Sequence, residues 1–187
     1  MKLVAGLGNP GDRYRGTRHN VGFEVADLLA RRHGLSFDTG PAAALQARWR
    51  RGDESIWLVK PLTFMNVSGE AVASLSRYYR VALADVLVVC DDVNLPLGRL
   101  RARPSGSDGG HNGLKSVALH VGTIDYPRLR VGVGRGDDRR DLADHVLARF
   151  EPDEMPGIET AIARAADAVE TWIDAGLERV MNTFNRD

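Results

Sequence analysis

The sequence predicts an α/β fold: a three-layer α/β/α sandwich around a twisted, mixed and mostly parallel sheet. Short apolar runs typical of buried strands alternate along the chain with amphipathic segments typical of helices. No internal repeat, low-complexity segment or linker separates them, and 187 residues are enough to bury one core. Residues 1–187 are therefore expected to form a single domain.

The first half of the chain predicts a strand, a helix and a hairpin, in that order. Residues 2–7 are apolar and end in glycines, as a buried strand that feeds a loop does. Residues 21–34 space their apolar side chains as a helix does, and Gly34 is the expected stop. Segments 43–50 and 55–60 flank the turn-like stretch RGDE and predict a hairpin.

The second half continues the alternation. The predicted helices are 69–81, 111–122 and 153–176, with 177–185 after them, and the predicted strands are 85–92, 98–104 and 126–134. In the strand at 98–104, arginine alternates with apolar residues. This period of two places three guanidinium groups on one strand face, those of Arg99, Arg101 and Arg103.

Charge and cysteine content limit the possible functions. The 25 Lys and Arg residues balance 25 Asp and Glu residues, so a polyanionic partner must be held by a local basic patch. Cys90 is the single cysteine, which excludes an intramolecular disulfide and suits a reducing compartment. The N-terminus does not resemble a signal peptide, and no apolar run approaches about 18 residues. A cytoplasmic protein without membrane contact is expected.

The stretch GLGNPG, residues 6–11, matches the dinucleotide-binding pattern G-x-G-x-x-G after a predicted strand. That pattern requires a helix at its third glycine, whose N-terminus holds the pyrophosphate. Here polar and arginine-rich residues follow until Val21, and Pro10 restricts Asn9 to extended conformations. No strand ends in an acidic residue about 20 positions on, where a ribose would need one. A dinucleotide site is therefore not expected.

The sequence contains no motif typical of a metal site or of a serine or cysteine nucleophile. The five histidines show neither H-E-x-x-H nor paired-cysteine spacing, so no metal or other cofactor is expected. Ser105 and Ser107 lack the first glycine of a G-x-S-x-G elbow and do not follow a core strand. Cys90 lies within an apolar strand, where a thiol is more often structural than reactive.

Polar loops follow several of the predicted strands, and in a parallel sheet such loops gather at one edge. They carry the amides of Asn9, Asn66 and Asn112 and the carboxylate of Asp91, while His19 begins the first helix. An imidazole oriented by a carboxylate can take a proton from water, and amides can stabilise an oxyanion. The set predicts water attack on an acyl carbon. The arginine strand would hold a phosphate-rich leaving group.

Taken singly, each of these features also has a structural interpretation. His19 with Asn20, and Asn66 with Ser68, are typical of helix caps. Asp91 can start a turn, and the arginines can form a solvated strand face. Phe64 and Met65 are more often core residues than a substrate platform. The functional hypothesis depends on the joint placement of the set at one edge.

In order and spacing, five motifs resemble the bacterial peptidyl-tRNA hydrolase family. They are GLGNPG..Y..TRHNVGF, KPLTFMNVSG, DDVNLPLG, GGHNGLKS and RLRVGVGR, between about Val4 and Arg135. The resemblance implies a usually monomeric α/β enzyme that needs no metal. Such an enzyme cleaves the ester between a peptide and the terminal ribose of tRNA, and so recycles tRNA from translation drop-off products.

The resemblance also implies roles for individual residues. His19 is the general base, kept in its basic form by Asp91, and Asn9 distinguishes peptidyl-tRNA from free aminoacyl-tRNA. The positions implied to contact the acceptor stem, the 3′ CCA end or the peptide are Tyr14, Phe64, Met65, Asn66, His111 and Asn112, and those implied to bind tRNA phosphate are Arg101, Arg103 and Arg130.

Two departures from the family pattern bear on the site. Asn94 replaces the second acidic residue of the family stretch Glu-Leu-Asp-Leu-Pro, which makes the local field less negative. Arg101 and Arg103 replace lysines and favour bidentate phosphate contacts.

Two other functions stay open at this point. The first is a non-catalytic RNA-binding protein on the same scaffold, like the splicing factors among plant-organelle relatives. The joint presence of His19 and Asp91 argues against it, because a binder needs no base with an orienting acid. The second is a small nucleotide-binding enzyme, which predicts that a cofactor co-purifies.

Overall fold

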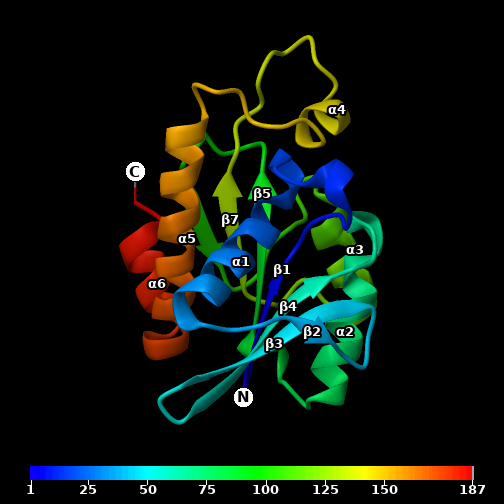
Figure 1. The fold of residues 1–187 in the computed structure, drawn as a ribbon, viewed down its shortest axis with the longest axis vertical. Coiled ribbons are helices and arrows are strands. Elements are labelled where there is room, and N and C mark those ends of the chain that lie inside the picture. Colours follow the sequence, from blue (N-terminus) through cyan, green and yellow to red (C-terminus); the bar gives the residue numbers. More distant parts are fainter. Residues whose placement is uncertain (187) are drawn as a thin grey trace.

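The structure, a computed structural model, describes residues 1–186, so Asp187 of the expected domain lies outside it. The strands form one sheet in the order β2-β3-β4-β1-β5-β7-β6 (Figure 1). Their bounds are β1 Lys2–Gly6, β2 Asp38–Thr39, β3 Ala44–Arg51, β4 Glu54–Pro61, β5 Val86–Asp92, β6 Leu100–Arg103 and β7 Arg128–Gly132.

The centre of the sheet is parallel and its edges are antiparallel. Strands β4, β1, β5 and β7 run in the same direction, while β3 with β2 and β6 with β7 pair antiparallel. Every residue of β5 is buried, as expected for a strand covered by helices on both faces. The carboxyl ends of β5 and β7 point toward the same end of the molecule, where α4 lies (Figure 1).

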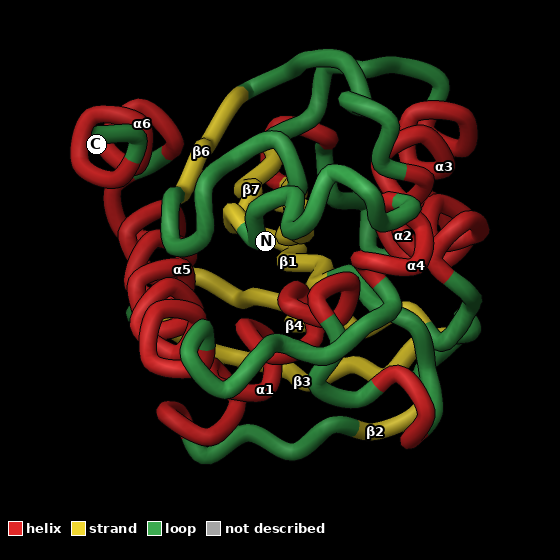
Figure 2. The backbone as a smooth tube through the Cα atoms, turned by 90° about the horizontal axis from the view of Figure 1, so that it is seen from above, coloured by secondary structure: helices red, strands yellow, loops and turns green. Residues whose placement is uncertain are grey.

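Helices cover both faces of the sheet (Figure 2). On one face α1, α5 and α6 pack against the sheet, and on the other face α2 and α3 do. The bounds are α1 Val21–His33, α2 Ser68–Tyr78, α3 Asn112–Val121, α4 Leu142–Val146, α5 Met155–Ala175 and α6 Leu177–Phe184. The predicted α/β/α sandwich is confirmed.

The predicted elements occur close to where their patterns place them. Helix α1 ends at Gly34, which adopts the left-handed conformation (φ 63°) that lets a glycine close a helix. Residues 6–11 lead into a short 3₁₀ turn, Asp12–Tyr14, and not into a helix, as the rejection of a dinucleotide site requires. Strand β2 and helix α4 are additional, and Tyr79 lies just beyond α2.

Candidate active site

His19 lies in a 3₁₀ turn, Arg18–Asn20, that runs directly into α1. The first turn of α1 lies very close to the sheet because residue 22 is glycine. A Cβ atom at Gly22 would come within 2.5 Å of the backbone of Leu7 and of Val89. This close approach brings His19 to the carboxyl end of β5, where Asp91 is the penultimate residue.

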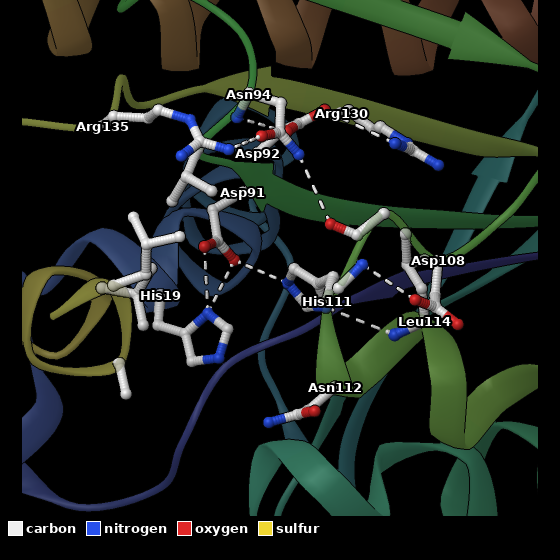
Figure 3. Close-up of a pocket in the computed structure, with 16 residues that line it drawn as sticks. His19, Asp91, Asp92, Asn94, Asp108, His111, Asn112, Leu114, Arg130 and Arg135 are labelled. Carbon is white, nitrogen blue, oxygen red and sulfur yellow. Dashed lines mark hydrogen bonds and ion pairs between the residues drawn. The ribbon is translucent and has the colours of Figure 1, made fainter.

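The pair of His19 and Asp91 is the centre of the site (Figure 3). The Nδ1 atom of His19 lies 2.9 Å from Oδ1 and 3.0 Å from Oδ2 of Asp91. A carboxylate accepts only, so Nδ1 carries the proton and donates it, and Nε2 keeps its lone pair. The imidazole is therefore oriented as a base toward the pocket.

A second imidazole also donates to Asp91. The Nε2 atom of His111 lies 2.8 Å from Asp91 Oδ1. Its Nδ1 accepts from the backbone amides of Gly113 (3.0 Å) and Leu114 (3.3 Å), so His111 is the N-cap of α3. Because Nδ1 accepts, Nε2 must be the protonated nitrogen. The backbone of α3 thus fixes the tautomer that binds Asp91.

These contacts determine the charge of Asp91, whose residue is 2% exposed. Burial alone would raise the pKa of this carboxyl group. The positive potential and the hydrogen bonds of His111 and His19 outweigh that effect and lower the pKa well below its usual range. Asp91 is consequently an anion that can stabilise a protonated His19.

The ligand atoms of His19, Asp91 and His111 lie within 4.8 Å of one another, a grouping that resembles a metal site. The donor chemistry does not fit one. His111 already uses its Nδ1 lone pair to accept two amides, so a metal at Nε2 would require an imidazolate. The cluster is better described as a carboxylate shared by two imidazole N–H donors.

Asn9 is held in one orientation by its surroundings. Its backbone N–H and C=O both bond the side chain of Asn20, at 2.8 and 2.9 Å. Its Oδ1 accepts from the amide of Met65 at 2.7 Å, so its Nδ2 remains as a donor. The sequence pattern predicts Asn20 only as a helix cap, whereas in the structure its side chain supports Asn9. Asn9 lines a neighbouring pocket of about 220 Å³ beside the His19 turn.

The other candidate substrate residues fall into two groups. Asn112 and His111 line the His19 pocket, and in Figure 3 the Asn112 amide and the unpaired nitrogen of His19 extend to the same side of Asp91. Asn66 is exposed in a 3₁₀ turn, Met65–Val67, that packs against the start of α3. Tyr14 and the 57% exposed Phe64 contact each other edge to face, outside both pockets.

One predicted contact is not available in this structure. Met65 is 4% exposed, and its side chain packs into the core beneath α2 and α3. Its sulfur packs so closely against Gly113 that a Cβ atom on that residue would lie only 2.6 Å from it. Met65 therefore supports the site through its amide to Asn9 and does not present its side chain to a substrate.

The predicted arginine surface extends over two strands. Arg101 on β6 lies opposite Arg130 on β7, and Arg103 lies opposite Arg128, so the four side chains share one face. Arg128 is buried, and its guanidinium donates hydrogen bonds to carbonyl oxygens, including that of Gly106. Arg130 donates to the Ser107 carbonyl at 2.6 Å and lies 3.5 Å from Asp92. Both β7 arginines thus hold the loop before His111.

The pocket around His19 has a volume of about 210 Å³. Helix α4, which the sequence did not predict, contributes Leu142, Ala143 and Val146 as an apolar wall. Arg18 anchors the segment around α4: its guanidinium donates to the carbonyls of residues 145, 148 and 149 and pairs with Glu154 at 2.7 Å. The His19 imidazole and an apolar wall therefore share one pocket.

A model of the family described as peptidyl-tRNA hydrolase matches residues 3–187. The chain belongs to the peptidyl-tRNA hydrolase family. A peptidyl-tRNA hydrolase from Symbiobacterium thermophilum is 47% identical over 186 residues, which cover 98% of both chains. One from Halalkalibacterium halodurans is 48% identical over 185 residues, covering 99% of this chain and all of the relative.

Solved structures of the family have the same fold. The crystal structure of peptidyl-tRNA hydrolase from Acinetobacter baumannii superposes with a TM-score of 0.92 at 31% identity, covering 99% of this chain and 94% of that one. Peptidyl-tRNA hydrolases are enzymes, so the chain belongs to a family of enzymes. Among the described residues, no helix is both long and apolar enough to cross a membrane.

Proposed function

We propose that this protein hydrolyses the ester bond between a peptide, or another N-blocked aminoacyl group, and the 3′-terminal ribose of tRNA. The observation that carries the proposal is the state of His19. Its Nδ1–H is engaged by the buried anion of Asp91, and within residues 1–186 its Nε2 has no hydrogen-bond partner and lies in a pocket beside amide side chains. A member of the peptidyl-tRNA hydrolase family with this arrangement has the groups that metal-free ester hydrolysis requires.

In the proposed reaction, His19 Nε2 takes a proton from a water molecule as the water oxygen attacks the ester carbonyl carbon. The carbonyl electron pair moves onto its oxygen and forms a tetrahedral oxyanion. When this intermediate collapses, the bond to the ribose oxygen breaks, and the departing oxygen takes the proton from the His19 imidazolium. Asp91 stabilises that imidazolium while it exists, without becoming protonated itself.

Three amides would bind the substrate around this centre. Asn9 offers a fixed Nδ2 donor to the peptide, because Met65 occupies its Oδ1. Asn112 and Asn66 lie on adjoining turns and have no hydrogen bonds that restrain their side chains within residues 1–186. One of these two is suited to orient the water or to stabilise the oxyanion.

The tRNA body would lie toward the edge of the sheet at β6. Arg101 and Arg103, together with Arg130, supply cationic groups for phosphates of the acceptor stem. Tyr14 and Phe64 offer an aromatic surface for the bases of the 3′ CCA end. The enzyme would act as a cytoplasmic monomer without a cofactor, returning tRNA from translation drop-off products to use.

The direct test is single-turnover release of peptide from N-acetyl-aminoacyl-tRNA in the presence of EDTA. We expect fast cleavage by the wild type and a fall of roughly 10²–10⁴-fold in His19→Ala. His120→Ala, which removes an exposed imidazole from α3, is the matched control and should cleave normally. A wild type that binds tRNA but releases no peptide would mean that the scaffold is an RNA-binding protein, and the catalytic roles would be withdrawn.

A further inference from the structure

Arg135 lies at the rim of the His19 pocket and is held there by Asn94. Its Nη2 donates to Asn94 Oδ1 at 2.7 Å, and Asn94 is itself fixed because its backbone amide donates to Asp92 at 2.7 Å (Figure 3). The guanidinium is therefore oriented although it is exposed. Its Nε and Nη1 donors have no partner among residues 1–186.

The hydrogen-bond partner of Arg135 is the neutral amide of Asn94, so the guanidinium keeps its positive charge. Within residues 1–186, no carboxylate lies within 4.0 Å of its guanidinium. An arginine that pairs with a carboxylate is neutralised by it, whereas one held by an amide keeps its full positive charge. Asn94 thus positions the cation without cancelling it.

The three carboxylates that line the same pocket have hydrogen-bond partners of their own, and none forms an ion pair with Arg135 within residues 1–186. Asp91 accepts from two imidazoles. Asp92 accepts from the Asn94 amide and lies 3.5 Å from Arg130, and Asp108 accepts from the amide of residue 110 at 2.8 Å. Of the cations that the described pocket presents, Arg135 is the one without an acidic partner.

Apolar side chains of α4 lie in the same pocket, because Leu142, Ala143 and Val146 line it together with Arg135. A guanidinium with two unused donors matches the paired oxygens of a carboxylate or a phosphate. The site is consequently suited to an anionic group that enters with the substrate.

We propose that Arg135, positioned by Asn94, binds an anionic oxygen group of the substrate and makes this enzyme favour substrates that carry one there. The inference rests on the proposed hydrolysis. The group is either an acidic side chain next to the scissile ester or a phosphate near the 3′ end of the tRNA. Arg135 and His19 line the same pocket, so either group would bind close to the reacting ester.

The test compares N-acetyl-glutamyl and N-acetyl-glutaminyl esters on the same tRNA body, because the two side chains differ mainly in charge. If the side chain is the ligand, wild-type kcat/KM should favour the glutamyl ester by about two- to fivefold, the range for an ion pair at an exposed site. Arg135→Gln should abolish the preference, and Asn94→Asp should reduce it by pairing with Arg135. Arg139→Gln, which removes a nearby exposed arginine bound to Asp137, should leave it unchanged.

A phosphate ligand gives a different pattern. Arg135→Gln would then lower kcat/KM equally for both esters and flatten its salt dependence. It would have no effect on N-acetyl-aminoacyl-adenosine, which lacks the neighbouring phosphates. Unchanged kcat/KM in Arg135→Gln on every substrate would overturn the inference while leaving the hydrolysis intact. Absence of wild-type cleavage would instead refute the proposed function.

Discussion

Asp91 accepts hydrogen bonds from two histidines that play different parts. His19 donates through Nδ1 and keeps Nε2 free, whereas His111 donates through Nε2 because α3 occupies its Nδ1. The first imidazole can exchange protons with a substrate, and the second is confined to one tautomer. His111 thus serves as a positioning residue that acts through Asp91, in addition to any contact with substrate.

Replacing Asp91 by asparagine tests this arrangement. The Asn amide can donate to His19 Nδ1, which would select the tautomer whose Nε2 carries a proton and cannot act as a base. We expect kcat for peptidyl-tRNA cleavage to fall roughly 10³–10⁴-fold while KM changes little. Asp92→Asn alters the adjacent carboxylate, which contacts neither histidine, and should cost far less. Equal losses in both variants would contradict the assignment.

The same carboxylate should contribute to stability in a pH-dependent way. Because the pKa of Asp91 is lower in the folded chain than in the unfolded one, its contribution is complete above the unfolded value of about 4 and is lost as the pH falls through the folded value. The Tm difference between wild type and Asp91→Asn should therefore stay constant above about pH 5 and shrink as the pH falls below about 4. Thermal unfolding by circular dichroism measures it. A difference that grows with acidity would contradict the anionic assignment.

Cys90 should be chemically inert despite its place next to Asp91. Burial, followed by the negative charge of Asp91, raises the pKa of the Cys90 thiol far above its usual range. We expect no alkylation by iodoacetamide at pH 8 in the folded protein and full alkylation in denaturant. Cleavage activity should survive the treatment. Rapid modification of the native thiol would show that Cys90 is accessible to solvent in the folded protein.

At the scale of elements, the segment that carries α4 depends on Arg18. The side chain of this arginine is 3% exposed and ties residues 145–154 to the turn that carries His19. Helix α4 has five residues and is too short to be stable alone, so its position depends on such anchors. His145 adds another, since its Nε2–H donates to the Gly134 carbonyl at 2.9 Å.

Arg18→Gln should therefore loosen the apolar wall of the pocket. Removing the guanidinium leaves Glu154 without its partner and should cost about 3 kcal/mol of unfolding free energy. We also expect KM for peptidyl-tRNA to rise more than kcat falls, in steady-state assays below the Tm. The control is Arg32→Gln, which breaks an α1–α5 ion pair away from the pocket and should change stability without changing KM. Parallel KM changes in both variants would remove the special role of Arg18.

At the scale of the whole molecule, zero net charge makes the placement of arginines decisive. Arg101 and Arg103 lie on edge strand β6, and their face continues across β7 toward the pocket through Arg130. The arginine face and the His19 imidazole thus occupy one region of the molecule. That arrangement suits a substrate that is a polyanion at one end and a peptide at the other.

The double variant Arg101→Ala/Arg103→Ala should raise KM with little effect on kcat. If each side chain neutralises one phosphate, the slope of log affinity against log salt should decrease by roughly 1.5–2. Arg48→Ala/Arg50→Ala provides the matched control, because these two arginines also alternate along an antiparallel strand, but far from β6 in the sheet. A loss confined to kcat would exclude phosphate binding.

The sequence predicted the helices and strands whose apolar residues follow a regular period. It also predicted the candidate site, because polar residues follow the carboxyl ends of the strands. The apolar period of α1 and the polar residues at the ends of β1 and β5 were sufficient to predict that His19 and Asp91 lie close together, as they do in the structure. Helix α4 was not predicted, because five residues within a charged stretch are too few to show a helical period of apolar residues. The bond from His111 to Asp91 spans 20 residues and depends on a helix cap, and the burial of Met65 depends on tertiary packing. Neither has a local signal.

The cap of α3 also makes the network of His19, Asp91 and His111 observable in solution. The amide protons of Gly113 and Leu114 are both donated to His111 Nδ1, on the ring whose other nitrogen holds Asp91. Opening this first helical turn frees both amides and releases the restraint on the ring in one event. Hydrogen–deuterium exchange at these two amides therefore reports how often the network comes apart. A substrate analogue that tightens the network should slow exchange at both positions together.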